Sequence, residues 1–212
     1  MALSIYFLKG YGDGERCFSA LSEERRRRAE RAGSAAVRRD TIFSYLLLRL
    51  ALSEEYGVLS APEFFYGEYG KPFLKETPEI SFSISHSGGA ALCAVADFSV
   101  GADLQKIRPI KSEVGRKFCT PLEMQTASRS GDPDRALCRL WSLKESYAKL
   151  TGKGFSEGFS SIDTAALLGR GTAFAVEREG FYLAAAADRS IRPPTVRVAT
   201  EEELLRLYGE GG

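Results

Sequence analysis

The stretch of residues 81–109 constrains the fold of this chain more than any other, because it predicts strands in close succession around a tight turn. Its first residues alternate serine with apolar residues, the period of two that is typical of a strand with one buried face. The next segment carries His86, the only histidine, and ends in paired glycines, which predict a turn with His86 on it. Ala90–Ala96 is small and apolar, as expected of a buried strand. Asp103 and Gln105 then fall on one face of a further strand. The stretch therefore predicts an imidazole, a hydroxyl and a carboxylate at the ends of packed strands.

The composition is that of an ordinary soluble globular protein, with 44% hydrophobic and 27% charged residues. At 212 residues the chain can form one compact unit with a substantial core. Its net charge of +1 gives no global attraction to nucleic acid or membrane, so we expect neither as a partner. No run approaches the roughly 20 apolar residues that would span a bilayer.

The four cysteines show no paired metal-ligand spacing, and no secretory leader precedes them. This usage predicts reduced thiols and a cytoplasmic location. We expect a monomer.

Capping signals predict the helices. Ser22 begins one helix, which ends at Gly33, and a longer apolar helix covers residues 34–56. Thr120, followed by proline and then glutamate, begins another with a capping box. A long helix ends at Gly152, and the remainder is mostly strand-like. The mixed order of helices and strands favours the α+β class.

The helix that begins at Ser22 carries an arginine cluster with two interpretations. Arg25 and Arg28, three residues apart, can share a face of the helix. Without further information a solvated helix face is favoured over a binding surface. An RNA-binding helix is a further hypothesis, but no aromatic-basic nucleic-acid motif accompanies the arginines.

Glu145, Lys149 and Asp103 are the candidates for chemistry. Glu145 and Lys149, four apart on a helix, more often form a stabilising surface pair than a catalytic one. A buried Asp103 would need a partner, and a divalent cation shared with Glu145 would supply it. Mg²⁺ takes one or two carboxylates and completes its shell with phosphate oxygens and water. Arg25, Arg28, Lys71 and His86 are available as phosphate partners, which makes the inventory that of a phosphoryl-transfer site.

Four motifs in this order resemble the 4′-phosphopantetheinyl transferases, in particular the larger type that activates peptide synthetases and polyketide synthases. They are Gly70-Lys71-Pro72, then Phe82-Ser83-Ile84-Ser85-His86-Ser87, then Gly101-Ala102-Asp103, and Leu140-Trp141-Ser142-Leu143-Lys144-Glu145-Ser146-Tyr147 with Lys149. The resemblance implies an α+β fold of two similar halves, residues 1–102 and 103–212, related by a pseudo-two-fold with the active site between them. The implied reaction moves the phosphopantetheine arm of coenzyme A onto a carrier-protein serine and releases 3′,5′-ADP.

The resemblance also implies roles for single residues. Asp103 and Glu145 match the magnesium ligands. Glu145 further matches the residue that takes the serine proton, directly or through water, and Lys149 would neutralise the departing phosphate. His86 matches a phosphate contact that can donate a hydrogen bond in either protonation state, with Ser85 beside it as a further coenzyme contact.

The coenzyme A contacts extend to basic residues outside this set. Lys71 matches a contact to the coenzyme, and Arg25 and Arg28 align with residues that hold the 3′-phosphate. Asp40 stands where the family often has arginine, so Arg39, one place away, is expected to substitute.

Gln105 is a second departure, because the family usually has an acidic residue there. Its amide oxygen can still ligate the metal, but one negative charge is lost. We therefore expect weaker metal binding to the free protein and greater dependence on bound coenzyme A.

Two functions remain open at this stage: an active Mg²⁺-dependent transferase, and a catalytically weak or silent module that binds coenzyme A or a carrier protein. The carrier is expected to dock between Ile110 and Met124, where Arg116 and Lys117 could meet an acidic surface and Phe118, Leu122 or Met124 an apolar patch. That these apolar residues belong to the core is an equal alternative. The residues do not distinguish fatty-acid, polyketide and peptide carriers.

Overall fold

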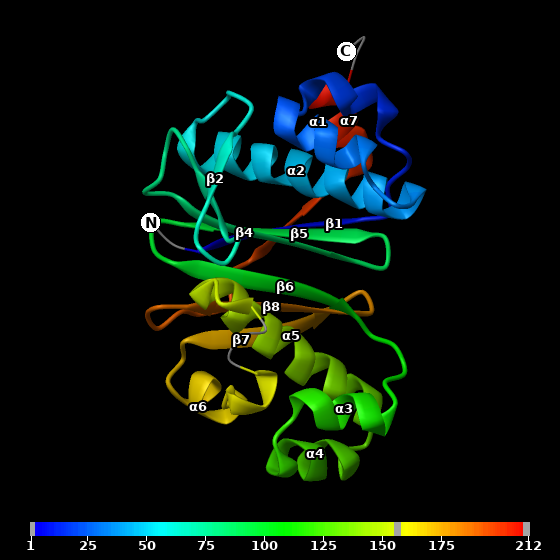
Figure 1. Cartoon of the computed structure of the whole chain (residues 1–212), viewed down its shortest axis with the longest axis vertical. Helices are drawn as coiled ribbons and strands as arrows, with labels where there is room; N and C mark the ends of the chain where they lie inside the picture. Colours follow the sequence, from blue (N-terminus) through cyan, green and yellow to red (C-terminus); the bar gives the residue numbers. More distant parts are fainter. Residues whose placement is uncertain (1–2, 155–157, 210–212) are drawn as a thin grey trace.

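The structure is a computed structural model that describes residues 3–154 and 158–209. Figure 1 shows two sheets stacked across the middle of the molecule, with helices on the outer side of each. This arrangement confirms the expected α+β class. The expected pseudo-two-fold relation between the halves stays a prediction.

The first half is a four-stranded sheet with helices above it. Its elements are β1 (Ser4–Lys9), η1 (Glu15–Ala20), α1 (Glu23–Glu30), α2 (Ala35–Tyr56), β2 (Phe64–Tyr66), β3 (Pro72–Leu74), β4 (Ser81–Ser87), β5 (Ala90–Ala96), β9 (Val196–Ala199) and α7 (Glu201–Tyr208). The strand order is β4-β5-β1-β9, with β9 parallel to β1 and the other pairs antiparallel. The helix α2 packs on β5, β4 and β1 because the centre of α2 is apolar on most sides.

The second half is a three-stranded antiparallel sheet with helices on its outer side. Its elements are β6 (Val100–Lys106), α3 (Ser112–Phe118), α4 (Pro121–Ser128), α5 (Pro133–Thr151), η3 (Phe159–Ser161), α6 (Thr164–Gly169), β7 (Ala173–Arg178) and β8 (Phe181–Ala187). The strand order is β6-β8-β7, and α5 lies across β6 and β8. The predicted capping box of α4 is present, and α5 ends at Gly152 in the left-handed region, as expected.

An apolar core lies between the two sheets. Phe7 of β1 meets Phe181 of β8 edge-on, with ring centroids 5.9 Å apart, and small alanines of β5 and β6 let the sheets approach. The last elements of the chain, β9 and α7, pack with the first half although they follow the second half in sequence. The expected boundary between residues 102 and 103 falls within β6 and stays a prediction.

The serines of β4 join the two halves through side-chain hydrogen bonds. The hydroxyls of Ser81, Ser83 and Ser87 accept the backbone N–H groups of Val100, Ala102 and Lys106 at 2.9–3.1 Å. The period-two serines thus satisfy an edge of β6 that β8 leaves unpaired. The fourth serine, Ser85, donates instead to the Asp103 carboxylate. The serine pattern therefore fixes the register between β4 and β6.

Gly101 brings α5 unusually close to β6. A Cβ atom on Gly101 would lie 2.1 Å from the Ser146 carbonyl oxygen and 2.2 Å from the Leu150 nitrogen, both backbone atoms of α5. Only glycine allows this approach, and it sets α5 directly over the face of β6 that carries Asp103.

One expectation needs correction, and one open alternative is decided. His86 lies within β4, paired with Ala91, and the turn consists of Gly88 and Gly89, both with positive φ. The alternation continues through His86 because Ser87 still bonds to β6, so the imidazole faces α2. Phe118 is buried against Trp141, so it belongs to the core and does not form a docking surface.

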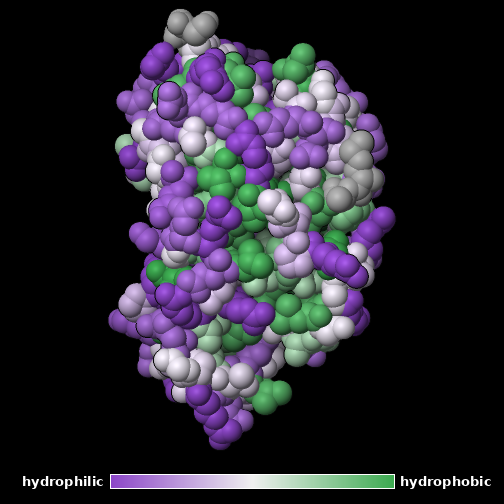
Figure 2. Space-filling model, turned by 180° about the vertical axis from the view of Figure 1, so that it is seen from behind, coloured by the Kyte–Doolittle hydropathy of each residue, from purple (hydrophilic) through white to green (hydrophobic). Residues whose placement is uncertain are grey.

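Figure 2 shows the face opposite to that of Figure 1. On this face the ends of the molecule are mostly hydrophilic, and hydrophobic patches lie across its middle. Among the described residues, no helix combines the length and the apolar character needed to cross a membrane.

Candidate active site

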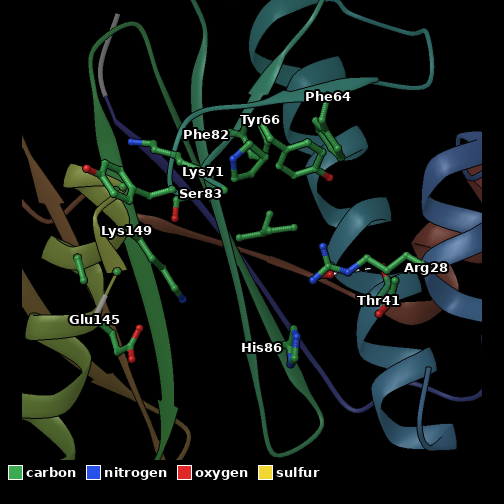
Figure 3. Close-up of a pocket in the computed structure, with 18 of the residues that line it drawn as sticks. Arg28, Thr41, Phe64, Tyr66, Lys71, Phe82, Ser83, His86, Glu145 and Lys149 are labelled. Atoms are coloured by element: carbon green, nitrogen blue, oxygen red, sulfur yellow. Dashed lines mark hydrogen bonds between the residues drawn. The ribbon is translucent and has the colours of Figure 1, made fainter. Parts of the chain in front are cut away.

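A cavity of about 320 Å³ lies between the two halves. Helices α1 and α2 and strand β4 supply one wall, and the C-terminal part of α5 supplies the other. Figure 3 shows Arg28 and Thr41 on one side, Glu145 and Lys149 on the other, and His86 on its strand between them. Phe64, Tyr66 and Phe82 add an aromatic surface beside these charged groups. The cavity thus combines an apolar surface with convergent charges, as ligand sites commonly do.

Asp103 is the buried carboxylate of the site, with 5% of its surface exposed. Its Oδ1 accepts hydrogen bonds from Lys149 Nζ at 2.7 Å and from Ser85 Oγ at 2.8 Å. Its Oδ2 is also buried but has no hydrogen-bond partner within the described part of the chain. A buried carboxylate oxygen without a partner is costly, so Oδ2 is available to a ligand that binds there.

Glu145 adds a second carboxylate next to Asp103, one turn before Lys149 on α5. Burial, together with the negative charge of Asp103, raises the pKa of Glu145, whereas the Lys149 ammonium opposes this shift. Two carboxylates therefore interact unfavourably here, and the one ammonium near them is bonded to Asp103. Such an arrangement favours an added positive charge.

The carboxylates fit a divalent cation. The described residues contain no group of three or more His, Cys, Asp or Glu side chains that could hold a metal on their own. Mg²⁺, however, is commonly bound by one or two carboxylates and completed by substrate phosphates and water. Asp103 Oδ2 and Glu145 supply two such oxygens. Gln105 is buried on the same strand, and its amide donates to the Lys106 carbonyl at 2.8 Å, which leaves its carbonyl oxygen as the acceptor.

Arg25 is a buried cation that the described residues only partly satisfy. The residue is 5% exposed, and its guanidinium donates one bond of 3.4 Å to the Thr41 carbonyl and lies over the rings of Tyr45 and Phe64. Its Nε has no partner among the described residues. Burial and the neighbouring Arg28 lower the pKa of Arg25 to about 10. Arg25 and Arg28 therefore form a positive pair at the cavity that an anion would relieve.

His86 is held from behind by α2. Its Nδ1 lies 3.2 Å from Asp40 Oδ2, and the Tyr11 hydroxyl donates to Asp40 Oδ1 at 2.6 Å. Burial lowers the pKa of His86, with smaller contributions from Lys149, Arg28 and Arg25, whereas Asp40 opposes the shift. His86 also lines a second, open cavity of about 770 Å³ together with Arg28 and Thr41. The histidine therefore lies where the two cavities meet.

Lys71 lies at the other end of the first cavity. Its ammonium donates to the Leu150 carbonyl at 2.7 Å, near the C-terminal end of α5, and its stem packs against Gly152. Burial lowers the pKa of Lys71. Lys71 therefore connects the β2–β3 hairpin to α5 in addition to facing the cavity.

The structure brings most of the predicted residues together. Those that line the first cavity are Arg25, Arg28, Lys71, His86, Glu145 and Lys149. Lys149 donates hydrogen bonds to Asp103 and Ser85, and so connects both residues to this set. Asp40 stands where the family often has arginine, and Arg39 was expected to take the place of that arginine. Arg39 lines neither cavity in the described part of the chain.

Sequence reasoning did not assign a role to Asp40, Thr41 or Ser44. Thr41 and Ser44 line the cavity, and Asp40 holds His86. The signal was present, because Asp40 and Thr41 lie four and three residues before Ser44, which stands within the apolar centre of the helix. That spacing puts them on one side of α2.

Comparisons with known proteins show which family the chain resembles in sequence. A model of the 4′-phosphopantetheinyl transferase superfamily matches residues 99–195. A 4′-phosphopantetheinyl transferase of Bacillus subtilis is 34% identical over 149 residues, which are 68% of this chain and 66% of the relative. The 4′-phosphopantetheinyl transferase Sfp of Bacillus subtilis strain 168 is 33% identical over the same shares, and psf-1 of Bacillus pumilus is 36% identical over 67% of this chain and 62% of its own length.

The chain belongs to the 4′-phosphopantetheinyl transferase superfamily. Its match spans slightly less than two thirds of the length of these relatives.

Proposed function

We propose that this protein transfers the 4′-phosphopantetheine arm of coenzyme A to a serine of an acyl-, peptidyl- or polyketide-carrier protein, with Mg²⁺ as cofactor, and releases 3′,5′-ADP. The observation that carries the proposal is the Asp103 carboxylate. One of its oxygens is held by Lys149 and Ser85, and the other is buried without a partner among the described residues, next to Glu145. This is the environment expected of a carboxylate that binds a metal together with a charged substrate.

The charge pattern of the cavity supports coenzyme A as the substrate. The basic groups at α1, β4 and α5 suit a molecule with three phosphates, and the aromatic surface beside them suits a purine ring. In this proposal Arg25 and Arg28 hold the 3′-phosphate, and His86 contacts a neighbouring phosphate oxygen. Lys71 contacts the coenzyme at the end of the cavity nearest α5.

The residues of α5 are proposed to carry the proton and charge changes of the reaction. The carrier serine oxygen forms a bond to the phosphorus that bears pantetheine, while the bond from that phosphorus to the bridging oxygen breaks. The serine proton passes to Glu145, directly or through water. Because Mg²⁺ bound to Glu145 would make this carboxylate a weaker base, we favour the route through water. Lys149 neutralises the charge that develops on the departing 3′,5′-ADP.

The metal is proposed to be held by Asp103 Oδ2 and Glu145, with the carbonyl oxygen of Gln105 as a neutral third contact. Mg²⁺ bound there supplies positive charge to the pyrophosphate. Because Gln105 is neutral, we expect the free protein to bind metal weakly and the coenzyme complex to bind it tightly.

The carrier protein is proposed to dock on α3 and α4. Val114 and Leu122 are exposed there, at 46% and 70% of their surface, and Arg116 and Lys117 are also exposed. Two apolar side chains beside two cations match a partner with an acidic surface and a small apolar patch.

The experiment is to incubate the protein with apo carrier protein, coenzyme A and Mg²⁺, and to measure the intact mass of the carrier. We expect addition of one phosphopantetheine arm. Asp103→Asn and Glu145→Gln should lower the rate by roughly 10²- to 10³-fold, the usual cost of removing a group that stabilises charge in the transition state. Glu202→Gln, at an exposed carboxylate on α7, is the matched control and should keep the wild-type rate. Wild-type kinetics in Asp103→Asn would refute the assignment.

A second candidate function is a catalytically weak or silent module that binds coenzyme A or a carrier. The observation that favours it is the neutral Gln105 beside Asp103. A Gln105→Glu variant that gains activity from an inactive parent would support it, whereas an active wild type would exclude it.

We also propose that the protein is a cytoplasmic monomer. Its four cysteines are buried and unpaired, as expected of a protein in a reducing compartment. Size-exclusion chromatography with light scattering measures the mass of the protein in solution and so tests whether it is a monomer.

A further inference from the structure

Asp40 is directed at His86 by the fold. His86 is the last residue of β4 on the side that faces α2, after Phe82 and Ile84, and 45% of its side chain is exposed. Asp40 lies near the start of α2, and its side chain is only 16% exposed. Its Oδ2 lies 3.2 Å from His86 Nδ1, so α2 presents a carboxylate to one particular nitrogen of the ring.

Tyr11 fixes the orientation of the Asp40 carboxylate. Its hydroxyl donates to Asp40 Oδ1 at 2.6 Å, and its ring stacks on Phe43 with centroids 4.6 Å apart. Burial and the bond to Asp40 raise the pKa of Tyr11 far above its ordinary value, so Tyr11 remains a donor. With Oδ1 occupied by Tyr11, Oδ2 is the acceptor that Asp40 offers to His86.

This contact determines which nitrogen of neutral His86 carries the proton. A carboxylate only accepts hydrogen bonds, so the single proton of the neutral ring is held on Nδ1. Nε2 then carries a lone pair. Because phosphate oxygens are also acceptors, a neutral His86 in this tautomer repels a phosphate at Nε2. The imidazolium has N–H groups at both nitrogens and can donate to Asp40 and to a phosphate at once.

We infer that Asp40 is a positioning residue that holds the proton of neutral His86 on Nδ1, so that His86 contacts a coenzyme phosphate only as the imidazolium. This inference rests on the proposed function for the identity of the phosphate. As a consequence, each coenzyme A that binds to the protein with neutral His86 is accompanied by the uptake of one proton from the solvent onto His86 Nε2. The notion that His86 donates to the ligand in either protonation state does not hold for this geometry.

The charges around His86 set the pH range of this uptake. Asp40 of α2 faces the ring, as do Lys149 of α5 and Arg28 and Arg25 of α1. Burial and the three cations lower the pKa of His86, so the ring of the free protein is mainly neutral at pH 7. A bound phosphate adds negative charge and raises that pKa. The complex then holds more protons than the free protein, so coenzyme affinity falls as pH rises between the two pKa values, by up to about tenfold per pH unit.

The test is ¹⁵N NMR of histidine-labelled protein, in which every imidazole signal belongs to His86 because the chain has no other histidine. In the free wild type at high pH we expect Nδ1 to be protonated and Nε2 to be bare. Asp40→Ala should move the proton of the neutral ring toward Nε2 and lower the pKa. Asp40→Asn keeps an acceptor without the charge, so it should retain the Nδ1 proton while the pKa still falls. Asp188→Asn, at an exposed carboxylate on the other half, should change neither.

Binding is then measured by calorimetry with coenzyme A at pH 7 in buffers of different ionisation enthalpy. We expect uptake approaching one proton per coenzyme in the wild type and less in Asp40→Ala, whose neutral ring already carries a donor at Nε2. The inference is wrong if neutral His86 of the wild type carries its proton on Nε2. It is also wrong if Asp40→Ala changes neither the tautomer nor the pKa of His86. Coenzyme A that fails to bind refutes the proposed function instead, because the tautomer is measured in the free protein.

Discussion

Gly101→Ala tests whether the close approach of α5 to β6 assembles the site. The new Cβ would lie 2.1 Å from the Ser146 carbonyl oxygen, and the backbone of α5 would have to recede by about 1.3 Å to reach an ordinary contact of 3.4 Å. Glu145 and Lys149 move with α5, while Asp103 stays on β6. A shift of that size breaks the 2.7 Å contact between Lys149 and Asp103.

The expected magnitudes follow from this displacement. Overpacking of a tight contact costs about 1–3 kcal/mol of unfolding free energy. A misplacement of about 1 Å in the catalytic groups costs roughly 10²-fold in rate. The assay is urea denaturation together with the kinetics of carrier modification. Gly131→Ala is the matched control, because its Cβ would enter open space and its φ is not in the left-handed region. A Gly101→Ala protein with the stability and rate of the Gly131→Ala control would refute the reasoning.

Three further predictions concern the buried charges. Glu145→Gln should lower the rate by roughly 10²- to 10³-fold yet raise thermal stability at pH 7. Burial raises the Glu145 pKa, so the charged form opposes folding increasingly as pH rises above the ordinary glutamate pKa. The gain in scanning calorimetry should vanish as pH falls toward 4, and each ~1 kcal/mol corresponds to roughly 2–4 °C. Lys144→Ala should cost about 3–5 kcal/mol in urea denaturation, because it removes the buried partner of Glu123; a double variant with Glu123→Gln should recover part of this loss. Arg25→Met should leave stability unchanged or higher, because it removes a partly satisfied buried cation, while calorimetry shows coenzyme A binding weakened by about tenfold or more; unchanged binding would contradict the role of Arg25.

The sequence predicted the local elements well because their signals are local. The Thr120 capping box begins α4, and the long helix ends at Gly152, as their residue types require. The alternation in β4 was also read correctly as a strand. Its serines carry long-range information that the alternation alone does not contain, since nothing in the pattern says that they bond to β6.

The contacts between elements could not be predicted, because they depend on which distant segments meet. Asp40 was noted only as a departure from arginine, whereas its contact with His86 depends on the packing of α2 against β4. The same holds for β9, which returns to pair with β1 after the whole second half. The site was located from its residue types and motifs, but its geometry had to come from the fold.

The most direct test of the account is the fate of an apo carrier protein incubated with the full chain, coenzyme A and Mg²⁺. We predict that the mass of the carrier rises by one phosphopantetheine arm, that 3′,5′-ADP appears in equal amount, and that Asp103→Asn slows both by roughly 10²- to 10³-fold. An unmodified carrier, tested with fatty-acid, polyketide and peptide types while coenzyme A is shown to bind, would contradict it.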